Sequence, residues 1–265
     1  MSRYRLIALD LDGTLLNSSM RLSETNTEAV RRAMDAGLWV VLATSRWYGL
    51  AKRTAEKIGC ESPIICSNGA EIRYPDGREL MHLALDAEAA RAVVTAGDDN
   101  GWDMYSTVGT ATYMKNRPGI IPDKLPAGLQ VADRQSDHLG EGATTCVQVF
   151  GEEPVSYVAE HFFPKYGDRV RFSFNTPVGM PHYVNLTHPD AEKARALEIV
   201  CKELGVESEE VIAMGDSESD IEMIKWAGLG IAMRNSPDEV KRAALHVAPS
   251  NDEDGVAWAV LKFLV

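Results

Sequence analysis

The sequence contains little cysteine and no long hydrophobic run, and we expect no signal peptide. Its four cysteines are Cys60, Cys66, Cys146 and Cys201. They form no C-x-x-C pair, so they suggest neither a zinc site nor a redox motif, and we expect reduced thiols. No apolar run is long enough to span a membrane, and the chain enters its first predicted strand almost at once. These absences predict a cytoplasmic protein that has no membrane partner.

Positive charge is also scarce in this chain. Lysine and arginine number 27 against 39 acidic residues, for a net charge of −12. Nucleic acids and anionic membranes are bound by basic patches, so neither is expected as a partner. The six histidines form no i, i+4 pair, and there is no G-x-x-x-x-G-K-[ST] motif, which excludes a nucleotide P-loop. An anionic substrate would therefore have to be held by local positive charge.

Apolar strands alternate with helices in the first third of the chain and again near its end. Strands are predicted at 4–9, 38–43 and 63–66, with helices at 23–36 and 47–58 between them. The same rhythm returns near Tyr183, with helices at 191–204, 217–227 and 237–244 and strands at 211–214 and 230–233. Such βαβ units predict a parallel sheet covered on both faces.

The intervening residues have a different pattern. Short strands are predicted near 102–106, 110–114, 144–150 and 170–174, with helices at 87–99 and 154–166. This mixture suggests a separate α+β module. We therefore predict one α/β core made of residues 1–85 and 185–265, with an inserted domain at 86–184; 265 residues are enough for a core with an insertion.

Polar residues follow four of the predicted core strands. Asp10 and Asp12 end the first strand, Thr44-Ser45-Arg46 the second, Ser67-Asn68-Gly69 the third, and Gly215-Asp216 a later one. The carboxyl ends of parallel strands are where ligands bind in open sheets. Carboxylates with a hydroxyl and a cation at that edge fit a magnesium and phosphate site.

At this point the motifs resemble those of a known family. Asp10-Leu-Asp12-Gly-Thr, Thr44, Lys193 and Gly215-Asp216-x-x-x-Asp220 are similar, in order and approximate spacing, to the four motifs of the haloacid dehalogenase-like (HAD) hydrolases. The insertion, residues 67–70 and the tail 250–256 resemble the Cof-type, class IIB phosphatases. The resemblance covers essentially the whole chain. It implies a Rossmann-like parallel sheet core with an inserted α+β C2-type cap domain.

The resemblance also implies roles for single residues. Asp10 would be the nucleophile that forms an aspartyl-phosphate, and Asp12 would be the acid and base. Asp10, the backbone carbonyl of Asp12 and Asp216 would hold Mg²⁺, with Asp220 supporting the metal site from behind. Thr44 and Lys193 would contact the phosphate as catalytic groups. The full set of residues expected to bind substrate is Thr44, Ser45, Arg46, Asn68, Gly69, Lys193 and Ser219.

Taken singly, several of these residues allow other interpretations. Lys193 alone is typical of a solvated helix lysine, and Asp220 of a helix-face acid. Thr44 could be satisfied by the backbone, and Arg46 fits an acid partner as well as it fits substrate. Four positions depart from the family pattern: Ser45 and Ala194 replace a glycine, Ser219 an asparagine, and Ser236 an alanine. These changes bear on substrate identity and efficiency more than on reaction type.

The predicted function is a Mg²⁺-dependent phosphatase acting on a small phosphorylated metabolite, with a sugar phosphate favoured, as a monomer or homodimer. Alternatives are a phosphoglycolate or mannosyl-phosphoglycerate phosphatase, a phosphomutase-type phosphotransferase, and a non-catalytic sensor of a phosphorylated metabolite. Within the inserted domain, Lys115 and Arg117 are candidates for contacting an anionic substrate, although the favoured explanation is an ordinary exposed pair.

Overall fold

Contacts in the computed structural model divide the chain into two units. The first comprises the residues up to Arg46, Ala51–Leu80 and those from Glu192 onward; the second comprises Trp47–Leu50 and Met81–Ala191. The structure describes residues 3–115, 125–140, 143–175 and 181–264. Arg117 lies outside these ranges. Among the described residues, no helix has the length and apolar character needed to cross a membrane.

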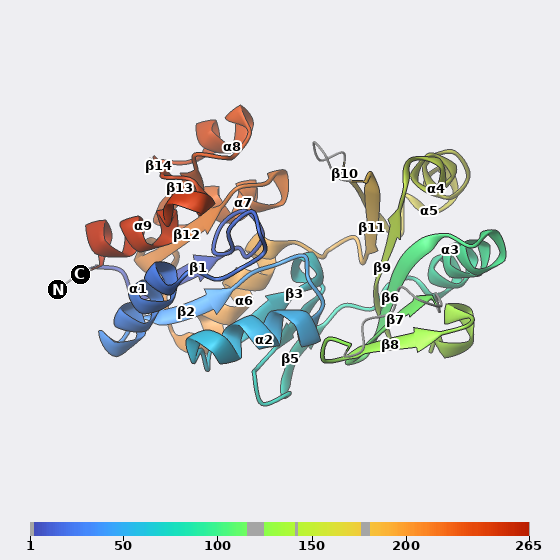
Figure 1. The fold of residues 1–265 in the computed structure, drawn as a ribbon, viewed down its shortest axis with the longest axis horizontal. Helices are drawn as coiled ribbons and strands as arrows, with labels where there is room; N and C mark the ends of the chain where they lie inside the picture. Colours follow the sequence, from blue (N-terminus) through green and yellow to red (C-terminus); the bar gives the residue numbers. More distant parts are fainter. Residues whose placement is uncertain (1–2, 116–124, 141–142, 176–180, 265) are drawn as a thin grey trace. The chain divides into compact units, whose positions relative to one another are not determined.

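The first unit is built on a parallel sheet with the strand order β14-β13-β12-β1-β2 (Figure 1). The strands are β1 (Leu6–Leu9), β2 (Trp39–Leu42), β12 (Val211–Gly215), β13 (Leu229–Met233) and β14 (His246–Ala248). In this sheet Leu9 is in register with both Leu42 and Met214. The carboxyl ends of β12, β1 and β2 are therefore level to within one residue, and the residues that follow them emerge at one edge of the sheet.

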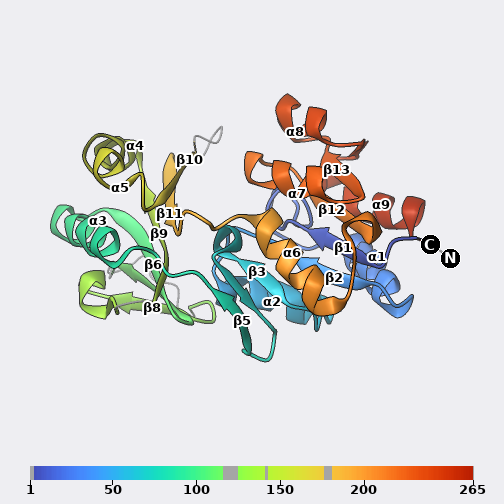
Figure 2. The ribbon, with the colours of Figure 1, turned by 180° about the vertical axis from the view of Figure 1, so that it is seen from behind.

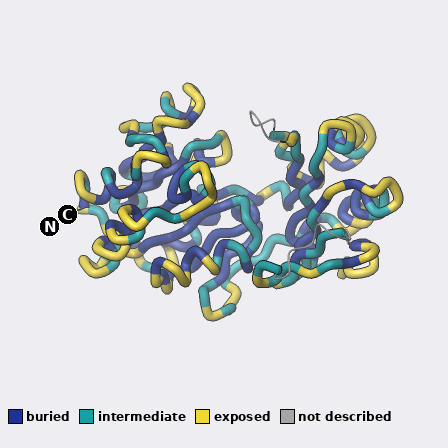
Figure 3. The backbone as a smooth tube through the Cα atoms, viewed as in Figure 1, coloured by how far each residue is buried: buried dark blue, intermediate teal, exposed yellow. Residues whose placement is uncertain are grey.

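Helices cover both faces of this sheet. α1 (Glu24–Asp35) and α9 (Gly255–Phe263) pack together on one face, and α6 (Lys193–Leu204) and α7 (Ile221–Trp226) lie on the other (Figure 2). The remaining helices of this part of the chain are α2 (Tyr48–Ile58) and α8 (Asp238–Ala243). Because both faces are covered, β1, β12 and β13 are buried along their whole length (Figure 3). This is the predicted Rossmann-like α/β fold.

A short antiparallel sheet, which we did not predict in full, extends from the third strand. It contains β3 (Ile64–Cys66), β4 (Glu71–Arg73) and β5 (Glu79–His82) in that order. Only β3 was predicted, although Pro75-Asp76-Gly77 is a strong turn sequence. β3 is tied to the parallel sheet by a bridge between Ala43 and Ile65.

The second unit has a six-stranded sheet of order β10-β11-β9-β6-β7-β8. Its strands are β6 (Asp103–Val108), β7 (Ala111–Lys115), β8 (Leu129–Ala132), β9 (Thr144–Phe150), β10 (Arg171–Asn175) and β11 (Tyr183–Thr187). α3 (Ala87–Asn100), α4 (Glu152–Tyr157) and α5 (Phe163–Tyr166) supply the helical side of its core. Val93, Val149 and Leu186 are fully buried in that core.

Two predictions for this region were wrong in detail. The helix expected at 154–166 is interrupted by a π-helical segment at Val158–Phe162. Pro164, at the start of α5, has no N–H to donate to the preceding turn, which accounts for the interruption. The α/β pattern was expected to return near Tyr183, but β11 pairs antiparallel with β9 and β10, and the second unit extends to Ala191.

Candidate active site

The predicted strand-end residues meet at the carboxyl edge of the parallel sheet. Asp10 directly follows β1, and its N–H donates to the carbonyl of Met214 at 3.0 Å. The N–H of Thr44 donates to the carbonyl of Ile65 at 2.9 Å. Asp216 directly follows β12. The sheet thus brings residues from distant parts of the sequence to one place, as predicted.

Lys193 is the centre of a buried charge network. Its Nζ atom donates to Asp10 Oδ1 at 2.7 Å and to Asp220 Oδ1 at 2.6 Å. The side chains of Lys193, Asp10 and Asp220 are only 2%, 6% and 0% exposed. Lys193 is also the first residue of α6, where the helix dipole adds positive potential. The structure therefore excludes the alternative of a solvated helix lysine.

Asp220 holds the loop that carries Asp216. Its Oδ2 atom accepts from the N–H groups of Asp216 and Ser217 and from the Ser217 hydroxyl, at 3.1, 2.9 and 2.9 Å. With Oδ1 bonded to Lys193, both oxygens of Asp220 are engaged. Asp220 is thus placed to orient Lys193 and Asp216.

Asp216 is fixed from the side of β1. Its Oδ1 atom accepts from the hydroxyl of Thr14 at 2.8 Å. Gly13 approaches the same carboxylate with a φ of +81°, and a Cβ atom at this position would lie 2.3 Å from Asp216 Oδ2. Only glycine fits here without displacing Asp216.

The carboxylates of Asp10, Asp216 and Asp220 can each offer an oxygen within 4.8 Å of the others. Burial raises the pKa of Asp10 well above its usual range. Burial, followed by the charge of Asp220, raises the pKa of Asp216 to about 7. Burial alone would lower the pKa of Lys193, but the charges of Asp10 and Asp220 raise it above its ordinary value, so the lysine is protonated.

This cluster fits a divalent cation. Two buried carboxylates, those of Asp10 and Asp220, share the Lys193 ammonium group, and the half-buried Asp216 lies beside them. The negative charge of the three acids exceeds the single positive charge of Lys193. Mg²⁺ prefers oxygen ligands of this kind. Asp10, Asp216 and Asp220 are the carboxylates of this cluster that could hold it.

The carboxylate of Asp12 pairs with Arg46. Arg46 Nε donates to Asp12 Oδ2 at 2.7 Å, and Arg46 Nη2 donates to Asp12 Oδ1 at 2.5 Å. Of the two interpretations of Arg46, the structure therefore contains the acid pair. Thr44 Oγ1 accepts from the N–H of Arg46 at 3.2 Å, which leaves the hydroxyl hydrogen of the buried Thr44 available to a ligand.

The turn Ser67–Gly69 lies against the start of α6. A Cβ atom on Gly69, whose φ is +94°, would lie 2.4 Å from the carbonyl oxygen of Glu192. Asn68 has a φ of +57°. This turn also contains a buried amide oxygen, Asn68 Oδ1, that has no hydrogen-bond partner among the described residues.

Ser45 and Ser219 are less firmly placed. The Ser219 hydroxyl is exposed and bonds to that of Ser217 at 2.9 Å, and Ser45 is partly exposed. In the described structure neither side chain bonds to the carboxylate cluster. Lys115 ends β7 in the second unit, with its Nζ atom beside Gly101.

Thr14, Ser217 and Asn235 are site residues to which the sequence analysis gave no role. Asn235 Nδ2 donates to the carbonyl of Gly13 at 2.8 Å, and Asn235 Oδ1 accepts from the N–H of Asn251 at 3.1 Å. Asn235 could have been identified from its position in the sequence, because it closely follows the end of β13 as Asp216 follows β12.

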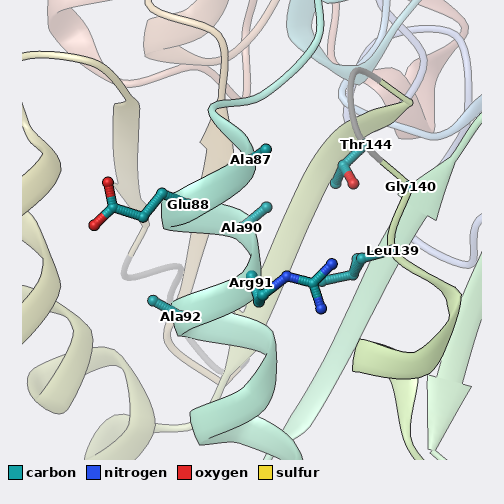
Figure 4. Close-up of a pocket in the computed structure, with 8 residues that line it drawn as sticks. All are labelled: Ala87, Glu88, Ala90, Arg91, Ala92, Leu139, Gly140 and Thr144. Atoms are coloured by element: carbon teal, nitrogen blue, oxygen red, sulfur yellow. The ribbon is translucent and has the colours of Figure 1, made fainter.

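A separate cavity of about 450 Å³ lies within the second unit (Figure 4). Ala87, Ala90 and Arg91 of α3 line one side of it, and Leu139, Gly140 and Thr144 line the other. Glu88 points to the other side of α3 from Thr144 (Figure 4). The residues lining this cavity include none of the predicted site residues.

Comparisons with known proteins agree with this geometry. A family described as haloacid dehalogenase-like hydrolase matches residues 7–260. The chain is 31% identical over 288 residues to the Bacillus subtilis protein named 5-amino-6-(5-phospho-D-ribitylamino)uracil phosphatase YwtE, covering 98% of each chain. It is 26% identical to a phosphoglycolate phosphatase from Methanothermobacter thermautotrophicus, covering 98% of this chain and 99% of the relative.

A crystal structure of a haloacid dehalogenase-like hydrolase from Bacteroides thetaiotaomicron is similar as well. It has a TM-score of 0.85 and 26% identity, covering 98% of this chain and 99% of the other. The family match spans both sequence segments that carry the carboxylates and Lys193. The chain belongs to the haloacid dehalogenase-like hydrolases.

Proposed function

We propose that this haloacid dehalogenase-like phosphatase hydrolyses the monoester of a small phosphorylated metabolite, with Mg²⁺ as its cofactor and Asp10 as its nucleophile. The observation that carries the proposal is the buried Lys193, which bridges Asp10 and Asp220 beside Asp216. Holding one carboxylate oxygen of Asp10 in a salt bridge fixes the orientation of the other oxygen. Such a fixed carboxylate is suited to attack.

In the first step, an oxygen of Asp10 forms a bond to phosphorus as the ester oxygen leaves. Asp12 gives its proton to that leaving oxygen, and the alcohol departs while the phosphoryl group remains on Asp10. In the second step, Asp12 takes a proton from water, whose oxygen attacks phosphorus and releases Asp10. One ester and one water give one alcohol and one phosphate, and Asp12 ends protonated as it began.

The phosphate would be held at the carboxyl edge of the sheet. The Thr44 hydroxyl, the Ser45 N–H and the Lys193 ammonium are its proposed donors, with Arg46, Asn68, Gly69 and Ser219 around them. Bound Mg²⁺, held by Asp10, Asp216 and the carbonyl of Asp12, would supply the charge that offsets repulsion between Asp10 and the phosphate dianion. We assign selection of the leaving group to residues 86–184, as a cap.

For the substrate we propose a sugar phosphate or a similar phosphorylated polyol. The name of one relative describes a phosphate on a ribityl chain, which is a polyol, and the name of another describes phosphoglycolate. Both are small molecules with an unactivated alcohol as the leaving group. That shared chemistry is the reason why the general acid Asp12 is central to the proposal.

The test is release of inorganic phosphate from a panel of esters, with Mg²⁺ and with a chelator. The panel includes sugar phosphates, phosphoglycolate, mannosyl-phosphoglycerate and a phosphoribityl compound. We expect turnover that needs Mg²⁺ and that Asp10→Asn abolishes. Isomerised sugar phosphate without released phosphate would instead indicate a phosphomutase. Tight binding of an ester without turnover would indicate a sensor. If the wild type and Asp10→Asn are equally inactive on every ester, the proposed phosphatase activity is refuted.

A further inference from the structure

The pairing of Arg46 with Asp12 has a geometry that bears on proton transfer. Arg46 offers two N–H groups to the two oxygens of one carboxylate, at 2.7 and 2.5 Å. A contact of this side-on kind fixes both the position and the plane of the carboxylate. Among the described residues, the Asp12 carboxylate accepts hydrogen bonds from Arg46 alone. The direction in which Asp12 presents its oxygens is therefore set by Arg46.

Arg46 is itself well anchored. Its carbonyl accepts from the N–H of Ser67 at 2.9 Å, and its own N–H donates to Thr44 Oγ1 at 3.2 Å. The Arg46 side chain is 12% exposed, whereas that of Asp12 is 34% exposed. Arg46 is thus more buried and more firmly held than Asp12. We infer that Arg46 determines the position of the Asp12 carboxylate.

We propose that Arg46 is a positioning residue that orients Asp12 for proton transfer to the leaving group. This inference rests on the proposed function, in which Asp12 is the general acid. Both carboxylate oxygens are engaged in the resting pair, and an acid must carry its proton on one of them. The N–H contact to one oxygen therefore opens in each turnover while the other keeps Asp12 aligned.

This role predicts a dependence on the leaving group. A sugar or alkyl alkoxide leaves only when it is protonated, whereas p-nitrophenolate leaves without a proton. A residue that acts through Asp12 should matter for the first kind of ester and not for the second. A residue that simply binds the phosphate should matter equally for both, because the phosphate is the same.

The experiment compares kcat/KM for p-nitrophenyl phosphate and for a sugar phosphate that the wild type hydrolyses. The value of kcat/KM depends only on the steps up to departure of the alcohol. It is therefore unaffected by the later step in which Asp12 acts as a base. For Arg46→Met we expect a loss of roughly 10- to 100-fold on the sugar phosphate, within the range of general acid catalysis, and less than about threefold on p-nitrophenyl phosphate. Arg46→Lys keeps the positive charge but loses the planar pair of N–H groups that contacts both oxygens of Asp12. We therefore expect a smaller loss of kcat/KM, again on the sugar phosphate only.

A double variant distinguishes action through Asp12 from an independent effect. Asp12→Asn should show the same selectivity between the two esters. Arg46→Met combined with Asp12→Asn should lose no more on the sugar phosphate than Asp12→Asn alone, since nothing is left for Arg46 to orient. Arg5→Gln removes an exposed pair with Glu210 at 3.2 Å and is the matched control, with both constants unchanged.

Several outcomes would overturn the inference. Equal losses on both esters would make Arg46 a phosphate ligand, and additive losses in the double variant would show an effect independent of Asp12. If kcat/KM for both esters is unchanged in Arg46→Met, the pair of Arg46 and Asp12 has no role in catalysis. Circular dichroism of each variant excludes misfolding. The proposed function is judged separately, by whether Asp10→Asn abolishes turnover by the wild type.

Discussion

Lys193 forms ion pairs with residues 183 and 27 positions away in the sequence. Its neighbours Ala191-Glu192-Lys193-Ala194-Arg195 read as an ordinary helix start, and nothing local indicates burial. The environment of such a residue is determined by which strands and helices meet, which a single sequence does not encode locally. Asp12 and Arg46 are a second case, since their pairing spans 34 residues. The sequence predicted which residues gather at the site but not which of them pair.

Replacing Lys193 by methionine should strongly destabilise the metal-free protein. The change leaves Asp10 and Asp220 buried without their shared cation, and breaking a buried pair in this way costs about 3–5 kcal/mol. Urea unfolding in the presence of a chelator measures the loss. Lys225→Met is the control, because Lys225 pairs with Glu222 at 2.8 Å in an exposed position and its replacement should cost at most about 1 kcal/mol. Similar losses in the two variants would contradict the buried network.

At the scale of elements, the core strands were predicted best. β1, β2 and β12 are continuous apolar runs, as buried parallel strands require, and their predicted limits agree to within about two residues. α1 also begins where its capping residue indicates, because Ser23 Oγ accepts from the N–H of Asn26 at 3.1 Å. β4 was missed because it is only three residues long and includes the charged Glu71 and Arg73. Those two charges are buried together as a pair at 2.6 Å, which their sequence does not reveal.

The contact between the Ser67–Gly69 turn and α6 predicts a catalytic effect from a single methyl group. Gly69→Ala would place its Cβ atom 2.4 Å from the carbonyl oxygen of Glu192, so the start of α6 has to move. Lys193 is the first residue of that helix, and a displacement of about 1 Å at a catalytic group can lower activity by about 100-fold. We expect kcat/KM for phosphate release to fall by roughly 10- to 100-fold.

Gly59→Ala is the matched control for this variant. Gly59 has a similar φ of +78°, but a Cβ atom there meets nothing within 4 Å. The positive φ should cost about 1 kcal/mol of stability in each variant. Gly69→Ala should cost more than this, because it also meets the backbone of Glu192. Only Gly69→Ala should lose activity. Equal activity in the two variants would mean that the turn does not position α6.

At the scale of the whole molecule, acidic charge dominates, with a net charge of −12. The acids of the site add to this excess, and their burial makes the carboxylate form unfavourable when no metal is bound. Asp216 illustrates the consequence, because its pKa is raised from 3.8 to about 7. A carboxyl group with a raised pKa in the folded state stabilises folding at low pH. That contribution is lost as the pH rises from about 4 to about 7, where the unfolded chain is already ionised.

Binding of Mg²⁺ should reverse this trend, because the metal needs the carboxylate that the metal-free fold disfavours. Protons then compete with Mg²⁺ for Asp216, and the competition is strongest below its pKa of about 7. We expect the gain in unfolding free energy from excess Mg²⁺ to be about 2 kcal/mol smaller at about pH 5.5 than at about pH 8, since one unit of pKa corresponds to about 1.4 kcal/mol. Urea unfolding with Mg²⁺ and with a chelator, at both pH values, measures the difference. In Asp216→Asn the gain should be small at both pH values. A gain in the wild type that is the same at both pH values would place the metal away from Asp216.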